Sequence, residues 1–176
     1  MSQTKDLIIC LSYARSGGTM LSQVIGHHTN ILMFSEVNPK LNAVSSIQEQ
    51  AKDWYGIELK EASFEKSIHE LLSLPELDEK QTMIRDFSFI DFTPHQLNDY
   101  KPLNNFGTIQ TLKGHYNLKT FAFVRDAFDV WISRDYPPQF SKYYLNYLQE
   151  LKKLGVRIFK YENFCENPIS ELEKKI

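Results

Sequence analysis

Small and hydroxyl-bearing residues interrupt an apolar run near the start of the chain. Residues 7–12 are mostly apolar, residues 15–19 read Arg-Ser-Gly-Gly-Thr, and apolar residues with helical spacing resume at Met20. An apolar run of this kind is typical of a strand buried in a parallel sheet. The loop after it can aim backbone N–H groups and hydroxyls at one point before a helix, where a phosphate group binds favourably. We therefore predict an anion-binding loop, with a glycine-rich turn that binds nothing as the alternative.

The position of the cation in this loop indicates which phosphate ligand to expect. The loop of nucleoside triphosphatases requires G-x-x-x-x-G-K-[ST], in which the lysine reaches the outer phosphates and the hydroxyl holds magnesium. Here Gly18 stands at the lysine position and Ser12 at the first glycine, whereas the cation is Arg15. This pattern disfavours a magnesium triphosphate. It favours an anion held by backbone amides, hydroxyls and one guanidinium.

A second cation follows another apolar strand. Residues 120–124 end at Arg125, and Ser133 stands eight residues later on the next predicted helix. About two helical turns separate them, a distance that a long arginine side chain can bridge. A solvated charge at a strand end is the alternative for Arg125 alone. Together with the first loop, the pair predicts a second site of anion contact.

These segments resemble the sulfotransferases that use 3′-phosphoadenosine 5′-phosphosulfate. Residues 13–21 are similar to that family's 5′-phosphosulfate loop, residues 121–133 to its 3′-phosphate motif, and residues 159–168 to its tyrosine-glutamate segment. The resemblance implies this compound as co-substrate, no metal, and transfer of a sulfuryl group to a hydroxyl or amine of a small molecule or saccharide. The residues that it implies for the co-substrate are Arg15, Ser16, Gly17, Gly18, Thr19, Met20, Arg125, Ser133 and Tyr161.

The resemblance also suggests residues for catalysis and for the acceptor. Arg15 would stabilise charge on the departing 5′ phosphate, and Asp86 is the candidate base, since phenylalanines occupy the nearby positions where the family often has histidine. A salt bridge to Arg85 or a helix cap is the alternative role of Asp86. Glu36 and His28 resemble family positions near the acceptor.

Departures from the family keep other functions open. Ala127 replaces a common proline, which should matter little because only a preset φ is lost. More important, no clear base is recognised and no counterpart of the family's later lid segment follows residue 168. A nucleotide-binding module that does not transfer is therefore the main alternative, and a P-loop kinase is a more distant one, disfavoured by Gly18.

The composition and the order of the predicted elements indicate the partners, the cellular setting and the fold class to expect. The 176 residues carry a net charge of −2 and two cysteines, which disfavours nucleic acid as a partner and favours a reducing, cytoplasmic setting. No targeting or membrane segment is recognised, and self-association stays open. Alternating strands and helices predict one α/β domain over residues 1–176: three layers around a mainly parallel sheet, of the P-loop nucleoside-triphosphate-hydrolase-like kind found in sulfotransferases.

Overall fold

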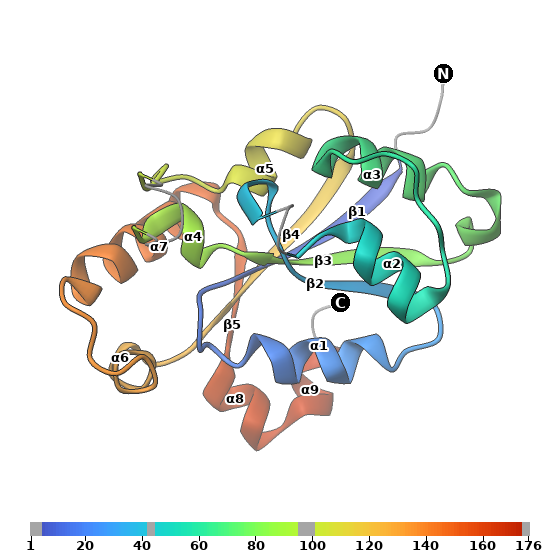
Figure 1. The fold of residues 1–176 in the computed structure, drawn as a ribbon. Coiled ribbons are helices and arrows are strands. Elements are labelled where there is room, and N and C mark those ends of the chain that lie inside the picture. Colours follow the sequence, from blue (N-terminus) through green and yellow to red (C-terminus); the bar gives the residue numbers. More distant parts are fainter. Residues whose placement is uncertain (1–4, 42–44, 95–100, 174–176) are drawn as a thin grey trace.

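A central parallel sheet organises the protein. The computed structural model describes residues 5–41, 45–94 and 101–173, and five parallel strands in these residues form one sheet in the order β2-β3-β1-β4-β5 (Figure 1). The strands are β1 (Asp6–Ser12), β2 (Ile31–Val37), β3 (Gln81–Phe87), β4 (Asn117–Val124) and β5 (Arg157–Lys160). Because the strands are parallel, all their carboxyl ends meet at one edge of the sheet. This edge is where α/β proteins bind ligands.

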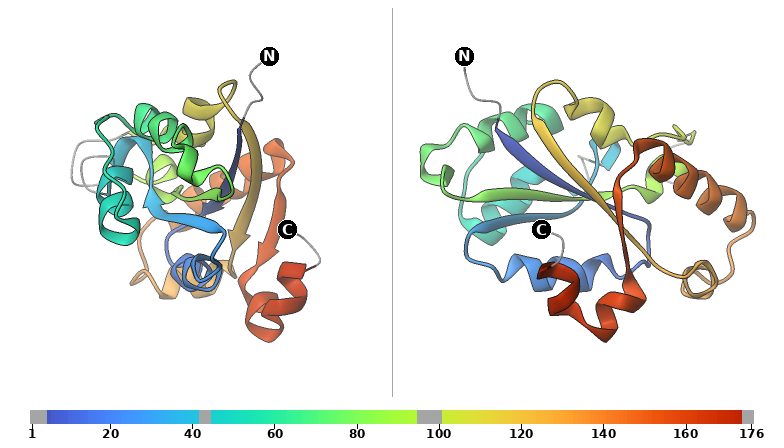
Figure 2. Two further views of the ribbon diagram at one scale, coloured as in Figure 1. Left: turned by 90° about the vertical axis from the view of Figure 1, so that its right-hand side faces the viewer. Right: turned by 180° about the vertical axis from the view of Figure 1, so that it is seen from behind.

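Helices connect the strands and cover both faces of the sheet. The α-helices are α1 (Gly18–Gly26), α2 (Ile47–Tyr55), α3 (Phe64–Leu72), α4 (Phe89–Phe92), α5 (Gly107–Leu112), α6 (Ala127–Ile132), α7 (Phe140–Leu154), α8 (Tyr161–Glu166) and α9 (Pro168–Glu173). Two short 3-10 helices, η1 (Pro39–Leu41) and η2 (Pro75–Leu77), lie in the connections. Helices α1, α8 and α9 lie on one face and α2, α3, α5 and α7 on the other (Figures 1 and 2).

The side chains on the two faces of β1 pack into two separate apolar cores. Leu7, Ile9 and Leu11 pack in the larger cluster, which includes residues of α3, α5 and α7, while Ile8 and Cys10 pack in a smaller cluster with residues of α1 and α8. Successive side chains of a strand point to opposite faces, so a strand covered on both faces must be apolar throughout. This requirement explains the unbroken apolar run and confirms the predicted α/β class with a parallel central sheet.

Helix α2 closes the outer edge of β2. The backbone N–H of Met33 donates to the Tyr55 hydroxyl at 2.8 Å, and this hydroxyl donates to the Met33 carbonyl at 2.9 Å. The Gln50 side chain makes two similar hydrogen bonds with the Ser35 backbone. Its Oε1 accepts from the Ser35 N–H at 2.7 Å, and its Nε2 donates to the Ser35 carbonyl at 2.8 Å. These bonds fix α2 against the sheet.

Some segments differ from what their sequence patterns predict. Apolar spacing predicts a helical stretch over residues 41–74, but the structure divides it between α2 and α3, because Gly56 adopts a left-handed conformation (φ 68°) that ends α2. The sequence around Pro39 predicts that the strand starting at Ile31 ends near Phe34, but β2 continues to Val37 through a bulge, with Glu36 at φ 55°. The residues Thr93-Pro94 predict a helix start, and this helix would extend into 95–100, outside the described residues.

Within the described residues, no helix combines the length and the apolar character that crossing a membrane requires.

Candidate functional site

A pocket lies at the carboxyl ends of β1, β3 and β4, around the loop between β1 and α1. Its volume is about 430 Å³, within the range of small-molecule sites. We call it the loop pocket. The residues that line it are Tyr13, Ala14, Arg15, Gly17, Gly18, Thr19, Glu36, Arg85, Phe87, Arg125 and Ser133. The predicted anion loop and the predicted second anion contact therefore share one pocket, although more than a hundred residues separate them in the sequence.

Gly17 lets the loop fold against Tyr161. It has φ 83°, and a Cβ atom at this position would lie 2.3 Å from Cδ2 of Tyr161, so a larger residue would clash. Gly17 is also the N-cap of α1, and no side chain caps this helix end. The first N–H groups of a helix lack partners inside the helix, so the start of α1, whose residues Gly18 and Thr19 line the loop pocket, can supply hydrogen-bond donors there.

Arg85 occupies the space beside Gly18. A Cβ atom at Gly18 would lie 2.6 Å from Nη1 of Arg85. The guanidinium is almost fully buried and is held by three neighbours: Nε donates to Ser22 Oγ at 2.8 Å, Nη2 donates to Ser35 Oγ at 2.6 Å, and Nη2 lies 3.1 Å from Glu36 Oε1. A strand residue thus places a cation over the position where triphosphatase loops carry lysine.

Arg15 joins the loop to the end of α6. Its Nε donates to the Ser133 carbonyl at 3.0 Å, and the positive φ of Arg15 (67°) turns the loop at this point. Ser133 is the C-cap of α6. The backbone and the guanidinium, rather than the Ser133 hydroxyl, therefore connect the two predicted anion contacts.

Arg125 is held from several sides. The buried Tyr144 donates its hydroxyl to the Arg125 carbonyl at 2.7 Å, and the guanidinium lies 4.7 Å from the centre of the Tyr161 ring. Asp129, one turn along α6, is 3.4 Å away. The Nε atom is buried and has no hydrogen-bond partner among the described residues. Tyr161, predicted to bind the ligand, instead supports Gly17 and Arg125 from outside the lining of the pocket.

Arg134 is a further cation behind the loop pocket. Its guanidinium carbon lies 3.8 Å from the centre of the Phe89 ring and 5.8 Å from that of Tyr13, and its Nε is buried without a partner in the described part of the chain. Burial lowers the pKa of Arg134, as does the positive charge of Arg15, while Tyr13 opposes the shift. Arg134 was not predicted from the sequence because it lies outside the motifs that indicate the anion contacts, the nearest of which ends at Ser133.

Positive charge predominates at the loop pocket. Arg15, Arg85 and Arg125 line it, while Glu36 is the carboxylate in its lining. Glu36 pairs with Arg85 and Asp129 pairs with Arg125, whereas no carboxylate among the described residues lies within ion-pair distance of Arg15 or Arg134. In a chain of net charge −2, this local excess indicates a site for an anion.

Several predicted site residues lie away from the lining of the loop pocket. Ser16 is fully buried, and its hydroxyl has no partner within the described ranges. Met20 packs against the smaller apolar cluster. His28 is exposed at the end of α1, where its Nδ1 accepts from the Asn30 N–H at 3.2 Å. Glu36 and Thr19 line the pocket.

Asp86 points away from the loop pocket into a buried polar cluster. It is fully buried and accepts from Ser88 Oγ at 2.6 Å, Thr108 Oγ1 at 2.5 Å and Asn38 Nδ2 at 3.0 Å. Asn38 Nδ2 also donates to Asp91 Oδ2 at 3.2 Å. Burial, and then the charge of Asp91, raises the pKa of Asp86 to about 7. The structure thus does not place this carboxyl beside Arg15, the other residue predicted to act in catalysis.

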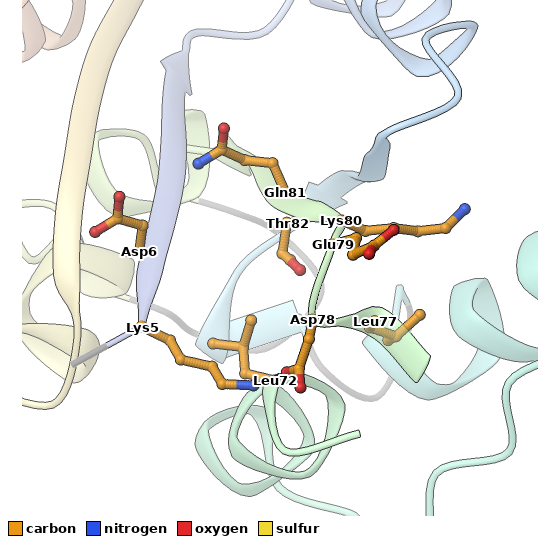
Figure 3. Close-up of a pocket in the computed structure, with 9 residues that line it drawn as sticks. All are labelled: Lys5, Asp6, Leu72, Leu77, Asp78, Glu79, Lys80, Gln81 and Thr82. Atoms are coloured by element: carbon orange, nitrogen blue, oxygen red, sulfur yellow. Dashed lines mark hydrogen bonds and ion pairs between the residues drawn. The ribbon is translucent and has the colours of Figure 1, made fainter. Parts of the chain in front are cut away.

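A second hollow lies at the opposite, amino-terminal end of the strands (Figure 3). The Lys5 ammonium lies 2.7 Å from the Asp78 carboxylate. Figure 3 shows these two groups side by side, while Lys80 extends away from Lys5. Its lining mixes both charge signs and includes Asp6 and Glu79. Lys5 of this hollow is therefore paired with a carboxylate, whereas Arg15 of the loop pocket has no carboxylate partner among the described residues. No group of three or more potential metal-ligating side chains occurs within the described residues.

No family model matches the chain, and no curated protein matches it. A similar solved structure is the crystal structure of thymidylate kinase from Ehrlichia chaffeensis, with 18% sequence identity, a TM-score of 0.42, and coverage of 89% of this chain and 86% of the other.

The prediction of a sulfotransferase is corrected by these comparisons. The named solved structure is a nucleotide kinase, and neither the family models nor the curated proteins supply support for a sulfotransferase. At this identity and TM-score, the likeness does not carry the kinase's reaction to this chain. The geometry of the loop pocket must therefore decide the function to propose.

Proposed function

We propose that this protein binds the phosphate groups of a nucleotide in the loop pocket. The observation that carries the proposal is the set of three guanidiniums, Arg15, Arg85 and Arg125, which line a single cavity together with the uncapped start of α1. Guanidiniums suit phosphate because they offer several N–H donors in one plane. The P-loop-like succession of β1, glycine loop and α1 adds backbone donors directed at the same point.

The arrangement of the cations suits an anion with more than one charged group. Arg15 and Arg125 reach the pocket from the loop and from the end of β4, and Arg85 reaches it from β3, on the other side of β1. A ligand with two or more phosphate groups can contact cations on both sides.

Isothermal titration calorimetry tests this proposal. The probes are inorganic pyrophosphate, adenosine diphosphate, magnesium-ATP and 3′-phosphoadenosine 5′-phosphate, the last because the sequence predicts its sulfated form as a ligand. We expect binding that is lost, by about a hundredfold or more, in the double variant Arg15→Ala/Arg125→Ala. The control is Lys119→Ala, which removes an exposed cation paired with Asp6, far from the pocket. Absence of binding by every probe would overturn the proposal.

A second candidate function is phosphoryl transfer, which the position of Arg85 favours. Its Nη1 lies over Gly18, so that a cation is present where triphosphatase loops use lysine. The test is transfer of the terminal phosphate of magnesium-ATP to a panel of nucleoside monophosphates. Preference for magnesium-ATP over 3′-phosphoadenosine 5′-phosphate, together with turnover abolished by Arg85→Ala, would support this candidate. Binding without turnover would leave the binding function alone.

A further inference from the structure

A groove along the edge strand β2 continues from the loop pocket. It has a volume of about 440 Å³ and lies between α1 and the end of α2, which flank β2 (Figure 1). Thr19 lines both the groove and the loop pocket. Ser35 lines the groove and accepts from the guanidinium of Arg85, which lines the pocket. The groove and the loop pocket therefore adjoin at Thr19 and around the hydrogen bond between Arg85 and Ser35.

Trp54 is the large exposed side chain of the groove. Its exposed fraction is 53%, and it lines both the groove and an adjoining hollow that shares Glu36 with the loop pocket. The neighbouring Tyr55 is anchored by both hydrogen bonds to the Met33 backbone, so the end of α2 is fixed. An exposed indole in a concave surface offers a flat face for stacking, and covering it with a ring is favourable because apolar surface leaves water.

The charge of the groove indicates which kind of group covers Trp54. Among the described residues that line it, none is lysine or arginine. The adjoining hollow carries the carboxylates of Glu36, Glu49 and Asp53. A second anionic group would be repelled there, whereas a planar ring without negative charge would not be.

We propose that this groove binds the planar ring system of the phosphorylated ligand, with the ring stacked on Trp54. The inference rests on the proposed phosphate binding in the loop pocket and narrows the ligand class. The ligand is a phosphorylated compound whose phosphate end contacts Arg85 and Thr19 and whose other end is an aromatic ring without negative charge, as in a nucleotide.

Fluorescence and binding measurements separate the two ends of the ligand. The chain contains two tryptophans, so Trp131→Phe leaves Trp54 as the single indole. We expect adenosine diphosphate to change the Trp54 emission and inorganic pyrophosphate to leave it unchanged, although both bind. Trp54→Ala should lower the affinity for adenosine diphosphate by about tenfold, a loss typical of base stacking on an aromatic side chain. The affinity for pyrophosphate should stay within about twofold.

Phe128→Ala is the matched control, because Phe128 is an exposed aromatic residue on α6, outside the groove. If Phe128→Ala lowers the affinity for adenosine diphosphate and Trp54→Ala does not, the ring binds at α6 and the inference is overturned. Equal losses for both probes in Trp54→Ala would also overturn it, since the effect would then not concern the ring. Failure of pyrophosphate itself to bind would instead remove the proposed function on which the inference rests.

Discussion

The Nε atom of Arg15 donates a hydrogen bond to the carbonyl of Ser133 at 3.0 Å and so ties the loop after β1 to the end of α6. The two residues are 118 positions apart in sequence. The bond uses one N–H of the guanidinium and leaves the others for a ligand. Arg15 therefore both shapes the loop pocket and contributes charge to it.

Replacement of Arg15 by lysine should separate these two roles. Lysine keeps the positive charge but lacks the Nε–H that reaches Ser133 in the present geometry. We expect Arg15→Lys to bind pyrophosphate about tenfold more weakly than the natural protein, and Arg15→Ala to bind it more weakly still. Calorimetry at fixed ionic strength measures both. Equal affinity of the alanine variant and the natural protein would show that Arg15 does not contact the ligand.

Gly18→Ala should displace Arg85 without unfolding the protein. The added Cβ would lie 2.6 Å from Nη1, at the far end of a long side chain, and 3.1 Å from Ser12 Oγ. We expect a loss of pyrophosphate affinity of about tenfold as this cation moves. Gly26→Ala is the matched control on the same helix, because its Cβ would meet Met33 at an ordinary 3.5 Å. The control should bind pyrophosphate with unchanged affinity. Its free energy of unfolding should rise by about 0.5–1 kcal/mol, because alanine favours a helix more than glycine does, and its melting temperature should rise with it.

Arg134→Gln should weaken anion binding through loss of long-range attraction. Arg134 does not line the loop pocket, yet its charge acts on Arg15 and lacks a carboxylate partner in the described part of the chain. We expect a loss of about fivefold in pyrophosphate affinity, or ~1 kcal/mol, that diminishes as salt is added. Arg157→Gln, which removes an arginine placed 5.7 Å over the Phe159 ring, is the control. A loss that does not depend on salt would argue for a structural role instead.

Asp86 should make stability depend on pH. Its pKa is raised to about 7 in the folded protein, above the value of 3.8 expected when it is exposed. The folded state therefore holds a proton that the unfolded state has lost between about pH 4 and pH 7, and its stability falls as the pH rises through this window.

Asp86→Asn should remove this contribution, because asparagine carries no charge at any pH. Between pH 5 and pH 8, the stability of the natural protein relative to the variant should fall by at least about 1.4 kcal/mol, the equivalent of one pKa unit. Urea unfolding at the two pH values measures the difference. Asp78→Asn, which changes an exposed carboxylate, is the control. The stability of this variant should change between the two pH values by the same amount as that of the natural protein.

The sequence predicted which strands and loops lie at the site better than it predicted which way their side chains point. The β1 run and the segment ending at Arg125 were recognisable because strands buried on both faces are apolar throughout, and parallel strands bring their ends together. In the structure, Arg15, Thr19, Arg125 and Ser133 line one pocket. The same local pattern said nothing of where a side chain turns after its strand ends.

Asp86 and Arg85 show why the rest of the site escaped prediction. Adjacent residues of a strand point to opposite faces, and only the packing of α1, α4 and α5 decides which face meets the pocket. Arg85 turns toward Gly18, whereas Asp86 turns toward Asn38 and Thr108. The motif resemblance compared residue types in order along the chain, and residue order does not contain this information.

The four hydrogen bonds between the side chains of Tyr55 and Gln50 and the backbone of β2 have a consequence for self-association. An open edge strand offers its N–H and C=O groups to any other strand and invites aggregation or the extension of a sheet across two molecules. At Met33 and Ser35 those groups are already occupied by side chains of α2. A second copy could add a strand there only by displacing the helix, so the sheet ends at β2 within one molecule.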